Sequence, residues 1–207
     1  MSFPERRFTE QSAARVVLEE RADGPPRIVG YASVFFDGSP DTQYELWEGT
    51  VERIMPGAFA RAIEEDDSRA LFNHEPDNLL GRTSADTLSL SEDKRGLRYE
   101  IIPPDTTIGR DVTEMVRRGD LQGSSFAFTT TDEEWRKEDG VMIRELRGVK
   151  LYDVGPVTYP AYEGTTTGLR AAGSDEARAS FEAWQKKQAA LQDELRARDV
   201  RIAELRA

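Results

Sequence analysis

The chain contains many short runs of β-branched and aromatic residues separated by turns rich in glycine, proline and charge, and this pattern limits its fold most strongly. Residues 27–36 are rich in such side chains, and apolar residues recur at every second position in 87–91 and 97–102. Alternation places successive side chains on opposite faces of a strand, so one face can be buried. We therefore expect a chain dominated by strands, with hairpins that pair residues 13–20 with 27–36 and residues 87–91 with 97–102. The other local expectations are a turn at 79–82, two strands at 141–146 and 149–154, and a last apolar segment at 157–162.

Two stretches have helical character instead. Residues 56–63 begin with Pro56, which fits the first turn of a helix because its missing N–H has no partner there. Residues 107–118 carry apolar side chains at helical spacing, and Gly119 follows as a C-terminal cap. The fold class expected is mainly β with flanking helices (α+β), in the form of a closed or nearly closed antiparallel β-barrel.

The character of the sequence changes near residues 171–174, after which there is neither glycine nor proline. Apolar residues then recur with coiled-coil spacing, at Phe181, Trp184, Leu191, Leu195, Ile202 and Leu205. We expect a mobile N-terminus over residues 1–12, a main domain over 13–170 and an amphipathic helical tail over 171–207. The tail could pair with another helix, associate with a second copy, or fold back onto the barrel.

Charge argues against several kinds of partner. The formal net charge is −11, and it lies outside residues 174–207, where seven acidic and seven basic side chains cancel. A nucleic-acid-binding surface needs clustered lysine and arginine, so no nucleic-acid partner is expected.

No apolar run approaches the ~20 residues that span a bilayer, and the first residues lack the apolar centre of a secretory signal. An intracellular, soluble protein without a membrane partner is expected.

The chemistry available to the chain is narrow because it has no cysteine and one histidine, His74. Disulfides, thiolate nucleophiles, cysteine-based zinc sites and multi-histidine metal sites are thereby excluded. We expect neither a metal nor a cofactor. Histidine is the side chain that ordinarily changes its protonation near neutral pH, so His74 is the candidate general base.

A serine hydroxyl becomes a good nucleophile when such a base removes its proton. Ser124 and Ser125 follow Gly123 and lead into an aromatic, apolar run, which indicates a turn feeding a buried strand. From the residues alone two interpretations stay open. The serines could be a strand-start pair that satisfies its own backbone, with His74 an ordinary loop histidine, or one serine could meet His74.

A third side chain would orient the imidazole, and with no second histidine it would be a carboxylate. Asp153 is the stronger candidate because it lies in an apolar strand, where a charge needs a partner. A residue that caps the following Gly155–Pro156 turn is the alternative. Glu75 is adjacent to His74 in sequence, but neighbouring side chains on an extended segment point to opposite faces.

Six blocks of sequence follow one another between about residue 28 and residue 169. They are Gly30-Tyr-Ala-Ser-Val-Phe, Ile54-Met-Pro-Gly-Ala-Phe, Leu71-Phe-Asn-His-Glu-Pro, Leu80-Gly-Arg-Thr, Gly119-Asp-Leu-Gln-Gly-Ser-Ser-Phe-Ala-Phe and Leu151-Tyr-Asp-Val-Gly-Pro-Val-Thr-Tyr-Pro-Ala. In their order and spacing these blocks resemble the prohead proteases of tailed bacteriophages, the serine peptidases that mature capsids.

The resemblance implies a role for three residues: His74 as general base, Ser125 rather than Ser124 as nucleophile, and Asp153 as the orienting acid. It implies a fold similar to that of herpesvirus assembly proteases, a β-barrel ringed by helices. Those enzymes use a second histidine, which this chain lacks. Ala127 stands where the family often has glycine, and the oxyanion donors stay open, with Arg82 one possibility.

The implied activity is cleavage of the scaffolding protein, the major capsid protein and the protease itself inside an assembling procapsid, in the host cytoplasm. A catalytically silent scaffold-type protein, or a protease–scaffold fusion, is the alternative. A hydrolase of small esters is disfavoured because Gly123-Ser-Ser-Phe-Ala lacks the second glycine of a Gly-x-Ser-x-Gly elbow.

Overall fold

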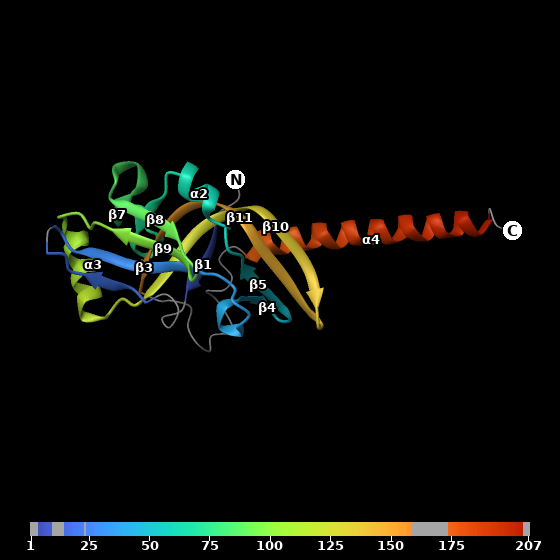
Figure 1. The fold of residues 1–207 in the computed structure, drawn as a ribbon, viewed down its shortest axis with the longest axis horizontal. Helices are drawn as coiled ribbons and strands as arrows, with labels where there is room; N and C mark the ends of the chain where they lie inside the picture. The colour runs from blue at the N-terminus through green and yellow to red at the C-terminus, as the bar shows by residue number, and fades with distance from the viewer. Residues whose placement is uncertain (1–3, 10–14, 23, 159–173, 205–207) are drawn as a thin grey trace.

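The computed structural model describes residues 4–9, 15–22, 24–158 and 174–204. Two β-sheets form the body of the molecule, with short helices around them and one long helix that extends outward (Figure 1). The smaller sheet has four antiparallel strands in the order β2 (Val17–Glu19), β3 (Arg27–Val34), β9 (Gly96–Ile101) and β8 (Leu88–Glu92). The β2–β3 and β8–β9 hairpins expected from the sequence are therefore confirmed.

The larger sheet has seven strands and mixes parallel with antiparallel pairing. Its main path runs in the order β1 (Glu5–Thr9), β10 (Gly123–Glu138), β11 (Val141–Val157), β5 (Thr50–Ile54) and β4 (Tyr44–Trp47). Two more strands join this sheet beside β11, namely β6 (Arg69–Leu71) and β7 (Leu79–Arg82). The long strand β11 pairs in parallel with β5 through its first half and with β6 near its end.

The helical segments lie between and after the strands. They are η1 (Pro40–Thr42), α2 (Ala60–Glu65), η2 (Phe72–His74), η3 (Thr83–Ala85), α3 (Thr107–Arg118) and α4 (Ser174–Glu204). Helix α3 begins where the Thr106 hydroxyl accepts a hydrogen bond from the Gly109 N–H. It ends at Gly119, which has a φ of 81° and donates to the last carbonyls, as predicted.

The expectation of a closed barrel was wrong, although a mainly β fold with a few helices is correct. In the described part of the chain, β1 and β4 form opposite ends of the main strand path and neither sheet closes on itself. The long strand β11 pairs with two different short strands, β5 along its first half and β6 near its end, so the larger sheet branches at β11 and does not follow one ring of strands. The core then lies between two sheets rather than inside one ring.

Three local expectations also differ from the structure. Residues 5–9, expected to be mobile, form β1, and residues 79–82, expected to be a turn, form β7. Two strands expected at 141–146 and 149–154 are one strand, β11. It continues through Gly148 opposite an irregularity in β10, where a Cβ on Gly148 would lie 2.9 Å from the Thr131 hydroxyl oxygen. The apolar segment predicted at 157–162 lies largely outside the described residues.

Aromatic side chains of β10 fill the space between the sheets. Phe126 and Phe128 are fully buried and their rings stack with centroids 5.0 Å apart. They pack in one cluster with Ile28 of β3 and Tyr99 of β9. Alternation along β10 directs Phe126 and Phe128 into this core, so Ser125, between Ser124 and Phe126, is directed to the opposite face.

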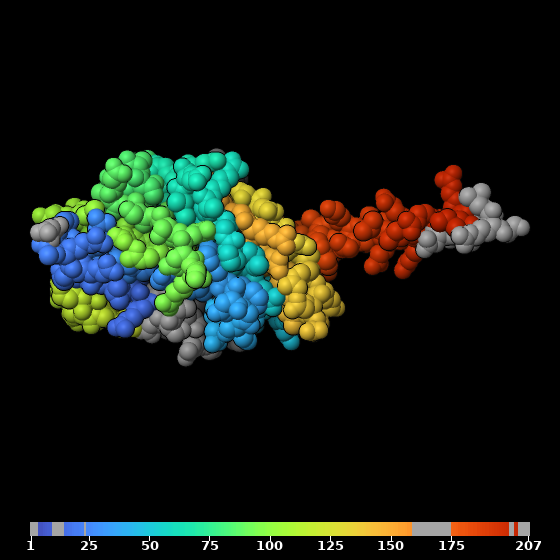
Figure 2. Space-filling model, viewed as in Figure 1, coloured from blue at the N-terminus to red at the C-terminus, as the bar shows by residue number. Residues whose placement is uncertain are grey.

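Helix α4 contacts the body only through its first turns and then projects outward (Figures 1 and 2). Phe181 and Trp184 pack in a second small cluster with Leu46 and Trp135, and the Trp135 indole donates to the Ser180 hydroxyl at 2.7 Å. Further along, Leu191, Leu195 and Ile202 are 49%, 41% and 40% exposed. The apolar stripe predicted for the tail is therefore covered at its beginning and open along the rest of the described helix.

Candidate active site

His74 ends η2, the short turn that follows β6, and its backbone has an unusual conformation. Asn73 and His74 have φ of 58° and 59°, in the left-handed region that non-glycine residues seldom adopt. Asparagine tolerates this region better than most residues. The Asn73 amide also bonds twice to Thr158 beyond β11, through its Nδ2 at 3.0 Å and its Oδ1 at 2.8 Å. These two bonds fasten the turn that carries His74.

A close approach of two backbones brings this turn to β11. Gly155 lies opposite Ser125 in the β10–β11 pairing. A Cβ on Gly155 would lie 2.2 Å from the carbonyl oxygen of Leu71, nearer than such atoms can approach. Glycine is therefore needed at this position for β6 and η2 to lie where they place His74.

Ser125 lies in β10 and its side chain is fully buried. Its hydroxyl oxygen lies 2.6 Å from Nε2 of His74 and 2.8 Å from the carbonyl oxygen of Arg7 in β1. Ser124 points to the opposite face, where its hydroxyl lies 2.8 Å from that of Tyr99. Burial raises the pKa of the Tyr99 hydroxyl above its ordinary value, so Tyr99 stays neutral. The two serines therefore have separate surroundings, and His74 contacts Ser125.

Asp153 approaches the other side of the imidazole. Its Oδ1 lies 2.5 Å from Nδ1 of His74, and the Asp153 side chain is nearly buried in β11. Glu75, the alternative candidate from the sequence, is exposed to solvent. The structure thus brings together His74, Ser125 and Asp153, which are far apart in the sequence.

This linear arrangement is the one that serine hydrolases use. One imidazole nitrogen faces the hydroxyl that would attack, and the other faces a carboxylate that can hold the ring and stabilise its cation. Strands β10 and β11 are paired at this point and carry Ser125 and Asp153, while η2 carries His74. Two paired strands and a fastened turn can hold such a geometry with little freedom.

Arg82, one possible oxyanion donor, is engaged elsewhere. Its guanidinium forms an ion pair with Asp67, with Nε 2.9 Å from Oδ1. Hydrogen bonding to Arg82 holds the pKa of the Asp67 carboxyl well below its usual range. No role at the Ser125 hydroxyl is therefore assigned to Arg82.

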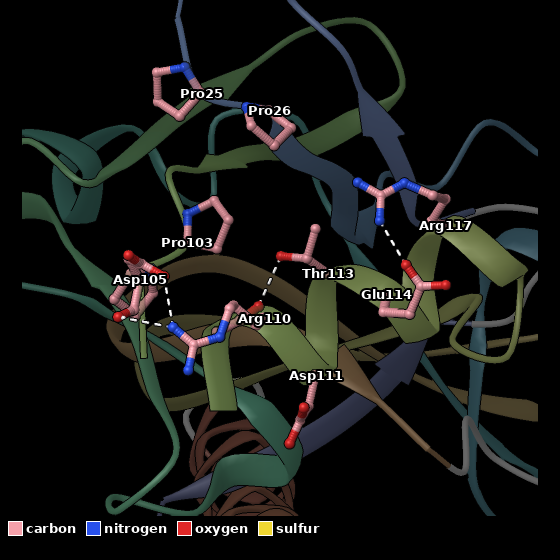
Figure 3. Close-up of a pocket in the computed structure, with 11 residues that line it drawn as sticks. Pro25, Pro26, Pro103, Asp105, Arg110, Asp111, Thr113, Glu114 and Arg117 are labelled. Atoms are coloured by element: carbon pink, nitrogen blue, oxygen red, sulfur yellow. Dashed lines mark hydrogen bonds and ion pairs between the residues drawn. The ribbon is translucent and has the colours of Figure 1, made fainter. Parts of the chain in front are cut away.

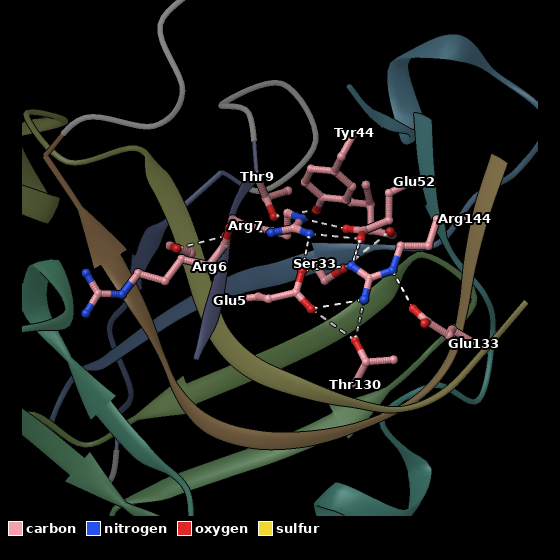
Figure 4. A network of polar contacts seen from close by, with 12 residues as sticks. Glu5, Arg6, Arg7, Thr9, Ser33, Tyr44, Glu52, Thr130, Glu133 and Arg144 are labelled. Carbon is pink, nitrogen blue, oxygen red and sulfur yellow. Dashed lines mark hydrogen bonds and ion pairs between the residues drawn. The ribbon is translucent and has the colours of Figure 1, made fainter. Parts of the chain in front are cut away.

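A buried cluster of charged side chains, which sequence reasoning missed, includes Arg7, the residue whose carbonyl oxygen contacts the Ser125 hydroxyl (Figure 4). Arg7 and Glu5 of β1 meet Glu52 of β5 and Arg144 of β11, and all four are almost completely buried. The distances are 2.5 Å from Arg7 to Glu52, 2.7 Å from Arg7 to Glu5, 2.7 Å from Arg144 to Glu5 and 2.9 Å from Arg144 to Glu52. Two cations and two anions alternate, so each buried charge has a partner.

A separate pocket of about 550 Å³ lies between helix α3 and the turn at Pro25 and Pro26 (Figure 3). Its walls are prolines, and its rim carries the ion pairs Asp105–Arg110 and Glu114–Arg117. None of the three clustered residues, His74, Ser125 and Asp153, lines it. The charged groups on its rim are exposed, and the pocket offers no arrangement of nucleophile and base.

Among the residues that the structure describes, no group of three or more histidine, aspartate or glutamate side chains is placed to hold a metal ion. No helix there combines the length and apolar character needed to cross a membrane.

Serine hydrolases are the class of enzymes that use a Ser–His–Asp arrangement of this kind. The family model of caudovirus prohead serine proteases matches residues 14–179, and the chain belongs to this family. Among solved structures, the capsid assembly protease gp21 of bacteriophage T4 aligns over 76% of this chain and 99% of that chain, with 14% identity and a TM-score of 0.41. A search of curated proteins found no match.

Proposed function

We propose that the protein is a serine endopeptidase in which Ser125 is the nucleophile, His74 the general base and Asp153 the orienting acid. The observation that carries this proposal is the contact of His74 with both partners, 2.6 Å to the Ser125 hydroxyl oxygen and 2.5 Å to an Asp153 oxygen. Membership of a protease family supports the reaction, and the geometry supports the assignment of roles.

In the proposed reaction, the Ser125 oxygen attacks a peptide carbonyl carbon while Nε2 of His74 accepts the hydroxyl proton. Asp153 accepts a hydrogen bond from Nδ1–H, which holds the ring and stabilises the imidazolium. His74 then passes the proton to the leaving amine, and an acyl-enzyme remains on Ser125. Water, deprotonated by His74, attacks the ester and releases the carboxylic acid, which regenerates the serine. Backbone N–H groups near Ser125 are the proposed stabilisers of the oxyanion.

The proposed substrates are the scaffolding protein and the major capsid protein of the same phage, and the protease itself, cut inside the assembling procapsid in the host cytoplasm. We further propose that α4 attaches the protease to helical scaffold or to a second copy. The exposed Leu191, Leu195 and Ile202 support this, because a helix pairing would bury them.

Co-expression with the cognate capsid and scaffolding proteins tests the proposal. The wild-type chain is expected to yield shortened capsid and scaffold bands, and Ser125→Ala to leave both uncut. Ser124→Ala is the matched control, since it removes the same group from the neighbouring residue on the opposite face, and cleavage should persist.

Two results would count against the proposal. If wild type and Ser125→Ala leave the same uncut bands, a catalytically silent scaffold-type protein is the better account. If Ser124→Ala abolishes cleavage and Ser125→Ala does not, the nucleophile has been assigned to the wrong serine.

A further inference from the structure

The N-terminal strand β1 covers the proposed nucleophile. It is the outermost strand on the main path of the larger sheet and pairs antiparallel with β10, where Phe8 lies opposite Ser125. The Phe8 ring stands edge-on to the imidazole of His74, with ring centroids 6.0 Å apart. With Ser125 fully buried, a peptide from outside cannot reach its hydroxyl in this arrangement.

Strand β1 also competes for the hydrogen that catalysis requires. The Ser125 hydroxyl lies between Nε2 of His74 and the carbonyl oxygen of Arg7, at 2.6 Å and 2.8 Å. A hydroxyl has one hydrogen, which it can donate to only one of these two acceptors at a time. A hydroxyl that donates to Arg7 is not being deprotonated by His74, so β1 opposes activation as well as access.

The way β1 is bound is the way an extended peptide binds to the edge of a sheet. Main-chain pairing supplies affinity, and alternate side chains enter pockets that supply selectivity. Glu5, Arg7 and Thr9 are the buried side chains of β1, and Arg6 and Phe8 lie on the other face. The carbonyl facing Ser125 belongs to Arg7, so a peptide in this register would present its backbone to the nucleophile.

The pockets that hold β1 discriminate by charge. Arg7 reaches Glu52 and its guanidinium lies over the Phe128 ring, 5.3 Å from the centroid. Glu5 reaches Arg144 and accepts from the Thr130 hydroxyl at 3.1 Å. An entering strand would match these pockets with an acidic residue two positions before a basic one (Figure 4).

Departure of β1 leaves the remaining charges paired. The strand carries away one acid and one base, Glu5 and Arg7. Arg144 keeps its contacts with Glu52 at 2.9 Å and with Glu133 at 2.5 Å. A buried charge without a partner would destabilise the protein strongly, and the departure of β1 leaves no such charge among these residues.

We propose that the β10 edge beside Ser125 is the acceptor site for the substrate, and that β1 occupies it in the resting protein. The substrate is an extended segment with an acidic residue two positions before a basic one, and it binds after β1 leaves. This inference rests on the proposed function, since it takes Ser125 as the nucleophile. The protease is then self-inhibited through its N-terminal strand.

A reversible lock on β1 tests the inference in the full chain. Arg6 and Ala127 face each other across β1 and β10, and the chain has no cysteine of its own. Facing residues in an antiparallel pair have Cα atoms about 4.5–5.5 Å apart, within the range of a disulfide. The double variant Arg6→Cys, Ala127→Cys can therefore be oxidised to hold β1 in place and reduced to release it.

The measurement is the rate at which a fluorophosphonate probe labels Ser125. Oxidation of the lock should slow labelling about tenfold or more, and reduction of the same sample should restore it, because labelling draws on the population with β1 released. The matched control is Ser91→Cys, Arg98→Cys, a facing pair in the other sheet, whose oxidation should change nothing. Equal and measurable rates in both states of the lock would overturn the inference.

Two peptides of identical composition test the charge pattern. A peptide with the sequence of residues 4–9, at about millimolar concentration to match a tethered strand, should slow labelling of the reduced protein. The same peptide with its glutamate and the arginine two positions later exchanged should have little effect. Equal inhibition by the two peptides would show that the site does not select an acidic residue two positions before a basic one.

Amide hydrogen exchange separates failure of this inference from failure of the proposed function, because it does not depend on catalysis. In the unlocked protein, residues 4–9 should exchange much faster than residues 149–157 of β11, and the lock should slow them. If β1 exchanges as slowly as β11, it is a permanent strand and the inference is wrong. If β1 exchanges quickly in the reduced protein and the probe still does not react, Ser125 is not the nucleophile and the proposed function fails, whereas the opening of β1 stands.

Discussion

Asp153 carries the most specific claim about a single side chain. Its carboxylate lies 2.5 Å from Nδ1 of His74, where it would hold the ring and stabilise the imidazolium. Asp153→Asn keeps the size of the side chain and removes the charge, and an amide in this position can favour the wrong tautomer. We expect cleavage to fall by about 10³- to 10⁴-fold, with the melting temperature changed far less.

The control for this prediction is Glu75→Gln, which makes the same chemical change on an exposed residue adjacent to His74. The measurement is the cleavage rate of each purified variant on the same capsid substrate, taken together with its melting curve. Only Asp153→Asn should cleave more slowly than wild type. Equal rates for Asp153→Asn and wild type would remove Asp153 from the proposed mechanism.

The three clustered residues could be predicted from the sequence, but the residues that position them could not. A single histidine and no cysteine limited the chemistry, and the family resemblance chose Ser125 over Ser124. Asn73 and Gly155 gave no comparable signal. Their roles depend on a left-handed backbone and on an approach of β11 to Leu71, and both are properties of the assembled fold.

At the scale of the element, the sequence did not predict β1 as a strand, because its buried side chains are charged or polar and not apolar. In Glu5-Arg-Arg-Phe-Thr the alternation is present, but the positions that face inward are Glu5, Arg7 and Thr9. Their burial depends on partners in β5 and β11, far away in the sequence. Hairpins such as β8–β9, whose apolar alternation is local, were predicted correctly, whereas the joining of residues 141–157 into one strand was not.

The attachment of β1 should depend on pH through Glu5. Burial by itself would raise the pKa of this carboxyl, but Arg144 and Arg7 outweigh it, and the pKa is lowered from its ordinary value of 4.5. A lowered pKa means that the carboxylate stabilises the folded protein above pH 4.5, and that this stabilisation is lost as pH falls through the folded-state pKa.

Glu5→Gln tests this, because it keeps the shape and does not titrate. At neutral pH it should lower stability by about 3 kcal/mol, since Arg7 and Arg144 each lose a buried partner. Below pH 4.5 the melting temperature of wild type should fall more steeply than that of the variant, so the two curves converge. Parallel curves from pH 7 downward would show that Glu5 is not stabilised as a carboxylate.

At the scale of the whole molecule, the compact body carries the candidate site and α4 extends from it (Figure 2). The excess negative charge belongs to the body, because the charges of residues 174–207 cancel. The helix and the position of its apolar stripe could be predicted from residue spacing. Which turns contact the body could not, since this depends on Trp47 and Trp135 in distant strands. The open sheets were also unpredictable, because local alternation does not specify which strands pair.

The central claim is that Ser125 is the nucleophile of a protease whose own strand β1 covers the active site. The most direct test is to treat the wild-type chain with a fluorophosphonate until labelling is complete and to locate the adduct by peptide mass spectrometry. The account predicts one adduct, on Ser125, formed slowly and absent from the Ser125→Ala and His74→Ala variants. An adduct on Ser124, or labelling of Ser125 that persists at an unchanged rate in His74→Ala, would contradict it.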